Sequence, residues 1–133
     1  MALVLDTGIV YAYYDRSDAW HERARSVMSE AARGLLLPAP VIPEVDHLLM
    51  TRLGVAACRV FYDGLMDGSY VVADLAAEGY VRVVELNRQY PEIGFVDAAV
   101  VAIAEARDLR RIATSDRRHF SPMAGPLSLE LVP

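Results

Sequence analysis

Lysine is absent from the sequence, and all 13 basic residues are arginine. This absence excludes reactions that need a catalytic lysine, and it excludes a P-loop, whose lysine contacts nucleotide phosphates. With 18 acidic residues the formal net charge is −5. An acidic chain binds the phosphate backbone of nucleic acids poorly. A function on nucleic acid therefore requires either a local arginine cluster or metal ions held by carboxylates.

Cysteine and long apolar runs are also scarce. Cys58 is the single cysteine, which excludes an intramolecular disulfide and is typical of a reducing compartment. No uncharged run approaches the roughly 20 residues of a membrane-spanning helix, and the most apolar stretch, residues 34–43, contains three prolines. The N-terminus lacks the basic and apolar regions of a signal peptide. These features predict a cytoplasmic protein.

The hydrophobic content is high, at 54% of 133 residues, which predicts a single domain over residues 1–133 with a substantial core. Apolar patterning and turn residues predict strands at 3–5, 35–37, 69–72, 111–114 and 127–132. Helices are expected at 9–14, 19–33, about 43–53, 55–67, 75–88 and 98–107. Such alternation predicts an α/β fold of three layers, with a mostly parallel central sheet flanked by helices.

Four acidic residues occupy similar positions in these elements. Asp6 follows the first strand, and Glu44 lies in the first turn of the helix after the second. Asp97 opens an apolar helix, and Asp116 follows the strand that ends at residue 114. Because helices that follow parallel strands begin at the carboxyl edge of the sheet, the four side chains are expected to converge there.

Each acid has a structural explanation as well as a functional one. An acidic residue at a helix N-terminus stabilises the helix by about 0.3–1 kcal/mol, so any one of the four could be only a cap. Asp97 is the clearest candidate for a functional role, because the helix that follows it is apolar all round. Several carboxylates in one pocket repel one another, and Mg²⁺ with its oxygen ligands relieves that repulsion. Such a site can activate water for attack on a phosphodiester.

Four motifs carry a resemblance that covers essentially the whole chain. They are Leu-Asp-Thr-Gly at 5–8, Pro-Glu-Val-Asp-His-Leu at 43–48, Gly-Phe-Val-Asp-Ala-Ala at 94–99, and Ala-Thr-Ser-Asp-Arg-Arg-His-Phe at 113–120. In order and spacing the chain resembles a PIN-domain ribonuclease, specifically a VapC-type toxin of a type II toxin–antitoxin system. The resemblance implies a PIN-like fold and a Mg²⁺-dependent endoribonuclease in which Mn²⁺ can substitute. It implies that the catalytic and metal-binding residues are Asp6, Glu44, Asp97 and Asp116.

The resemblance also implies partners and a substrate-binding surface. The expected partners are RNA, a cognate VapB-type antitoxin and a second copy of the chain, within a higher toxin–antitoxin assembly and without a membrane. Position 8 is glycine where many family members have serine. The arginines near residue 117 are either a solvated surface or contacts to RNA phosphates, for which a guanidinium is well shaped. The predicted substrate-binding residues are Thr7, Thr114, Ser115 and Arg117.

Two other functions compete with RNA hydrolysis. A non-catalytic PIN-like domain that binds RNA or protein would be marked by a broken set of acids, and this set is intact. Phosphoryl transfer through Asp6, as in haloacid-dehalogenase-like phosphatases or response-regulator receivers, would use a lysine, which the chain lacks. Those phosphatases also have a second aspartate two positions after the first, where this chain has Gly8.

Overall fold

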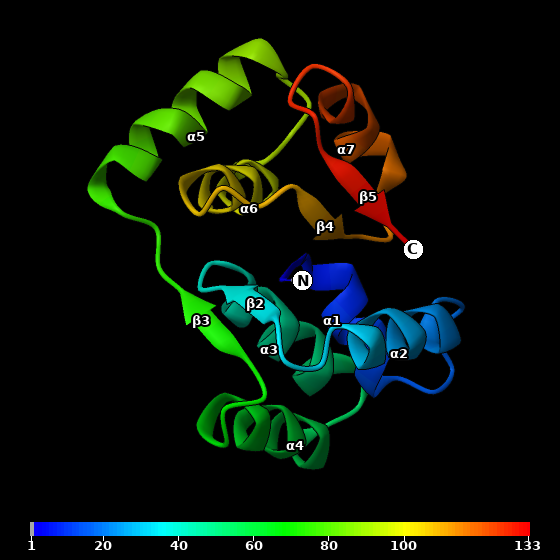
Figure 1. The fold of residues 1–133 in the computed structure, drawn as a ribbon. Coiled ribbons are helices and arrows are strands. Elements are labelled where there is room, and N and C mark those ends of the chain that lie inside the picture. The colour runs from blue at the N-terminus through cyan, green and yellow to red at the C-terminus, as the bar shows by residue number, and fades with distance from the viewer. Residues whose placement is uncertain (1) are drawn as a thin grey trace.

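A computed structural model describes residues 2–133 (Figure 1). Five short strands form one sheet in the order β3-β2-β1-β4-β5, and every pairing between neighbours is parallel. The predicted α/β fold is therefore confirmed. The strands are β1 (Leu3–Leu5), β2 (Leu35–Pro38), β3 (Val71–Ala73), β4 (Arg111–Ala113) and β5 (Glu130–Val132).

Within residues 2–133, seven helices cover the two faces of this sheet. In Figure 1, α1 to α4 lie on one side of the sheet, and α5, α6 and α7 lie on the other. None of the helices within residues 2–133 has the length and apolar character needed to cross a membrane. The helices are α1 (Thr7–Tyr14), α2 (His21–Glu30), α3 (Val41–Arg52), α4 (Val55–Met66), α5 (Ala77–Gln89), α6 (Phe95–Ala106) and α7 (Arg117–Ala124).

The strand order creates a crevice at the carboxyl end of β1. The chain leaves β1 toward β2 and β3, then crosses to the other side of β1 to form β4. Right-handed crossovers place the connections before and after this reversal on opposite faces. The segments that follow β1 and β4 therefore diverge and leave a space between them, where α/β proteins bind ligands. Asp6 and Asp116 lie at the two sides of this crevice.

Helix α6 is the buried helix that its composition predicts. Residues 98–104 are buried without interruption, and the helix packs between α5 and strands β1 and β2. It begins at Phe95 and not after Asp97, because Gly94 already has extended backbone geometry and ends the preceding loop. Asp97 therefore lies in the first turn. The turn still faces the crevice, so the shift does not remove Asp97 from the site.

Helix α7 was missing from the sequence prediction. Pro122 and Gly125 suggested an irregular tail, yet residues 117–124 are helical. The Asp116 side chain caps this helix by accepting a hydrogen bond from the backbone N–H of His119 at 3.1 Å. A cap of this kind satisfies an N–H that has no partner inside the helix. The remaining errors are at element ends: α2 is shorter than the predicted 19–33, and β3 begins two residues later than predicted.

Candidate active site at the carboxyl edge of the sheet

Asp6 is the most deeply buried acid of the crevice, with 4% of its surface exposed. Its backbone N–H donates to the carbonyl of Ala113 at 3.0 Å, which fixes it beside β4. The hydroxyl of Thr114 donates to Asp6 Oδ2 at 2.8 Å, and Thr114 Oγ1 accepts a hydrogen bond from the backbone N–H of Asp116 at 2.9 Å. Thr114 therefore joins the acids at the ends of β1 and β4.

Glu44 reaches the crevice from α3, in the first turn of the helix. Its Oε1 accepts a hydrogen bond of 2.6 Å from the hydroxyl of Thr7, the first residue of α1. Thr7 and Glu44 also line one hollow together with His47. The pair thus forms the wall of the crevice on the side of α1 and α3.

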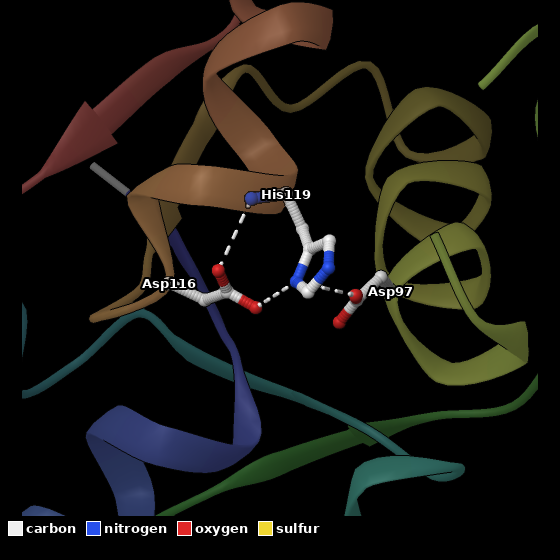
Figure 2. Close-up of side chains that lie close together, drawn as sticks. All are labelled: Asp97, Asp116 and His119. Atoms are coloured by element: carbon white, nitrogen blue, oxygen red, sulfur yellow. Dashed lines mark hydrogen bonds and ion pairs between the residues drawn. The ribbon is translucent and has the colours of Figure 1, made fainter. Parts of the chain in front are cut away.

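Asp97 and Asp116 face each other across the ring of His119 (Figure 2). The imidazole Nδ1 lies 2.7 Å from Asp116 Oδ2 and 3.9 Å from Asp97 Oδ2. Within residues 2–133, these three form the one group of potential metal ligands whose donor atoms all lie within 4.8 Å of one another. Asp6 and Glu44 lie outside this group. His119 was not among the predicted site residues, although its position three residues after Asp116 is a sequence signal once α7 is known to be a helix.

Burial and mutual repulsion make it unfavourable for the carboxylates of the crevice to be ionised at the same time. The pKa of Asp6 is raised to about 7, mainly by burial and also by the charges of Asp97 and Asp116, although the hydrogen bond from Thr114 acts to lower it. Burial also raises the pKa of Asp97 to about 6, with contributions from Asp116 and Glu44. Glu44 is therefore close enough for its charge to act on Asp97. The charges of Asp116 and Glu44 act on Asp97, and those of Asp97 and Asp116 act on Asp6, so the four predicted acids lie in one region.

The donor set fits a divalent cation. The crevice offers carboxylate oxygens, which are the usual ligands of Mg²⁺ and Mn²⁺, and one imidazole nitrogen, which binds transition metals. A cation there would offset the repulsion that raises the pKa values of Asp6 and Asp97. The residues that could hold it are Asp97, Asp116 and His119 as the compact group, with Asp6 and Glu44 beside them.

The predicted substrate-binding residues have different surroundings from one another. Thr114 is fully buried, and its hydroxyl is used by the two acids. Ser115 is half-buried, with its hydroxyl directed at Gly8: a Cβ built on Gly8 would lie 2.5 Å from Ser115 Oγ. Arg117 turns its guanidinium toward the C-terminal strand, where Nη2 donates to the carbonyls of Leu131 and Pro133.

Comparison with known proteins identifies the family to which the chain belongs. A model of the PIN domain matches residues 3–125, which is nearly the entire chain. The chain belongs to the PIN domain family. All four acids lie inside the matched residues, so the PIN domain includes the complete crevice.

Individual PIN-domain relatives are similar over most of their length. Ribonuclease VapC26 of Mycobacterium tuberculosis is 31% identical over 123 residues, which make up 91% of each chain. The crystal structure of VapC20 from the same species, a toxin that cleaves the sarcin-ricin loop, has a TM-score of 0.82 at 20% identity and covers 91% of this chain and 95% of its own. VapBC2 of Rickettsia felis, bound to a promoter DNA fragment, has a TM-score of 0.75 at 16% identity, with 100% of both chains covered. The solved structures show that the PIN fold is shared.

Proposed function

We propose that this protein is an endoribonuclease toxin of the VapC type, which hydrolyses RNA phosphodiester bonds with a divalent metal ion. The observation that carries the proposal is the 31% identity to a VapC ribonuclease across 91% of both chains. The crevice supports it, because it gathers acidic residues that fit a metal ion, and a bound cation would let an acidic chain hold an anionic substrate there. We further propose that residues 1–133 act as a single PIN domain, in the cytoplasm, where RNA substrates occur.

The acids of the crevice have distinct proposed roles. Asp97 and Asp116 hold Mg²⁺, for which Mn²⁺ can substitute, and Asp6 and Glu44 complete the acidic set directly or through water. When bound, the ion lowers the pKa of a water molecule and stabilises charge on the phosphate. Thr114 positions Asp6 and the backbone of Asp116 through its two hydrogen bonds. Because Thr114 is fully buried, we assign it a positioning role in place of direct contact with RNA.

The substrate is held by groups at the rim of the crevice. Thr7 and Ser115 offer hydroxyls on its two walls. Since Arg117 is engaged by backbone carbonyls of the C-terminal strand, we propose Arg118 as the phosphate-binding arginine. Arg118 is exposed and lines a hollow together with His119, next to the acids.

The partners are proposed from the related structures. The fold matches a toxin–antitoxin complex from Klebsiella pneumoniae with a TM-score of 0.75 at 17% identity, covering 100% of this chain and 97% of that one. The VapBC2 structure from Rickettsia felis also contains a toxin and its antitoxin. We propose that a VapB-type antitoxin neutralises this protein and that the toxin forms a homodimer within the larger assembly.

RNA cleavage by the purified protein tests the function. We expect Mg²⁺-dependent cleavage that EDTA abolishes, and we expect Asp97→Asn and Asp6→Asn to lower the rate by at least about 100-fold. Asp63→Asn on the exposed surface of α4 removes the same charge far from the crevice and is the matched control. Thermal melting should show that all three variants are folded. Full activity in EDTA, or in the Asp97→Asn variant, would contradict the metal mechanism.

A further inference from the structure

His119 lies in the compact part of the acidic crevice but is not one of its acids. Figure 2 shows the imidazole ring between the carboxylates of Asp116 and Asp97, which come from different elements of the fold. The side chain of His119 is 31% exposed, so an ion from solvent can reach it. The hydrogen-bonding contact of the ring is between Nδ1 and Asp116 Oδ2, and the Asp97 carboxylate lies farther from the same nitrogen.

The distances around the ring match those between ligands of one ion. For metal–ligand bonds of about 2.1 Å, adjacent ligand atoms in an octahedron lie roughly 3 Å apart and opposite ones roughly 4.2 Å apart. His119 Nδ1 is 2.7 Å from Asp116 Oδ2 and 3.9 Å from Asp97 Oδ2. All three donor atoms lie within 4.8 Å of one another, a spacing that one ion can bridge. Asp6 and Glu44, by contrast, are not within the same 4.8 Å group.

The first turn of α7 explains why the histidine and the aspartate act together. Asp116 caps the helix, and its Oδ1 accepts the backbone N–H of His119 at 3.1 Å. That bond fixes the backbone of both residues and leaves Asp116 Oδ2 and His119 Nδ1 side by side. Binding an ion would replace the contact between these two atoms and leave the cap intact. The first turn of α7 thus preorganises Asp116 and His119, while Asp97 comes from α6.

We propose that His119 is a nitrogen ligand of the metal site. The proposal rests on the proposed function, which assigns a metal ion to these acids, and it deepens that function by naming the ligand that sets the choice of metal. Imidazole favours transition metals, whereas an all-carboxylate site favours hard ions such as Mg²⁺. His119 therefore shifts the preference of this site toward ions such as Mn²⁺ and Co²⁺.

Pulsed electron paramagnetic resonance of the Mn²⁺-loaded protein tests the ligand directly. We expect a coupling between Mn²⁺ and an imidazole nitrogen in the wild type, and its loss in His119→Gln and in His119→Ala. The chain has three histidines, and His47 is the informative control because it lines a hollow with Glu44. His47→Gln should retain the coupling. His21 is engaged elsewhere, with Nδ1 2.7 Å from the carbonyl of Ala12.

Binding titrations at one fixed pH provide a second measurement. We expect His119→Gln to weaken Co²⁺ binding by about tenfold or more and Mg²⁺ binding by less than about threefold. Mn²⁺ binding without nitrogen coupling, or coupling that persists in both His119 variants, would overturn the role of His119 and leave the metal-dependent function standing. Failure of the wild type to bind Mn²⁺ or Mg²⁺ at all would overturn both proposals. Melting curves of the two variants establish that they are folded.

Discussion

Thr114 is fully buried and uses its hydroxyl twice, as a donor to Asp6 and as an acceptor from the backbone of Asp116. A hydroxyl can fill both roles at once, so one side chain connects the ends of two neighbouring strands. The carboxylate of Asp6 is thereby held in place although its burial makes ionisation unfavourable. At the scale of single residues, the neutral side chain of Thr114 thus holds the acidic residues of the crevice in position.

The pKa of Asp6 predicts how the metal-free protein responds to pH. An unfolded chain releases this proton near pH 3.8, whereas the folded chain keeps it until about pH 7. The folded state therefore binds more protons over this interval, and the contribution of Asp6 to stability is lost as the pH rises from about 4 to about 7. The free energy of unfolding in EDTA should fall by an amount on the order of a few kcal/mol from this group. Urea titrations across the interval measure it.

Asp6→Asn is the control for that prediction, because asparagine does not titrate. The difference in unfolding free energy between wild type and Asp6→Asn should change with pH between about 4 and 7 and should be constant above that range. Adding Mg²⁺ or Mn²⁺ at neutral pH should restore stability to the wild type and much less to the variant. A difference that does not vary with pH would show that Asp6 ionises normally.

Gly8 has a local explanation in Ser115. A Cβ at position 8 would lie 2.5 Å from Ser115 Oγ but 3.8 Å from Ser115 Cβ, so the conflict is with the hydroxyl alone. Alanine is otherwise favoured over glycine in a helix by up to about 1 kcal/mol. We expect Gly8→Ala to be neutral or destabilising in the wild type and stabilising in a Ser115→Ala background. A double-mutant cycle of melting curves measures this coupling, expected at about 0.5 kcal/mol or more; additive effects would contradict it.

At the scale of elements, α7 combines a structural and a chemical role in its first residues. Asp116 caps the helix and also lies in the group of potential metal ligands. Two substitutions separate these roles. Asp116→Asn keeps a side-chain oxygen that can cap, so its stability should stay close to that of the wild type while RNA cleavage is lost. Asp116→Ala should lose cleavage and also about 1 kcal/mol of stability. Chemical denaturation and cleavage assays compare them, and equal stability of the two variants would exclude a capping role.

The same helix shows which features could be predicted from the sequence. The strands, the buried helix α6 and the positions of the acids at one edge follow from apolar patterning and from the geometry of parallel sheets. Helix α7 does not, because Pro122 has no N–H to donate and proline is unfavourable inside helices. In this short helix the cap from Asp116 and the burial of Phe120 and Met123 outweigh that preference.

Besides helix α7, the sequence did not reveal those residue roles that depend on tertiary contacts. His119 looked like one member of a basic segment, and its place beside Asp97 becomes apparent only when α6 and α7 meet at the crevice. Thr114 and Arg117 were predicted to contact RNA from their proximity to Asp116 in the sequence. One is buried and the other contacts the C-terminal strand, because side chains that follow one another on a helix or strand point in different directions.

At the scale of the whole molecule, charge limits how the protein can meet RNA. The net charge is −5 and the chain has no lysine, so electrostatic attraction to RNA of any sequence is weak. Two arginines at the amino end of β4 are also occupied within the protein: Arg110 donates to the carbonyl of Leu127, and Arg111 pairs with Glu130. Productive binding must therefore depend on the metal ion, on a few local contacts and on the shape of the RNA.

This weak general attraction predicts selective cleavage. On induction of the wild-type protein in cells, new 5′-phosphate RNA ends should map to a small number of sites, since an RNA that lacks the right shape has little affinity for the crevice. Sequencing of 5′-phosphate ends measures this, with Asp97→Asn expressed at the same level as the control for cleavage by other nucleases. New ends spread over most transcripts would mean that electrostatic binding suffices. In that case net charge would not limit RNA binding, while the Asp97→Asn control would still decide the role of the acids.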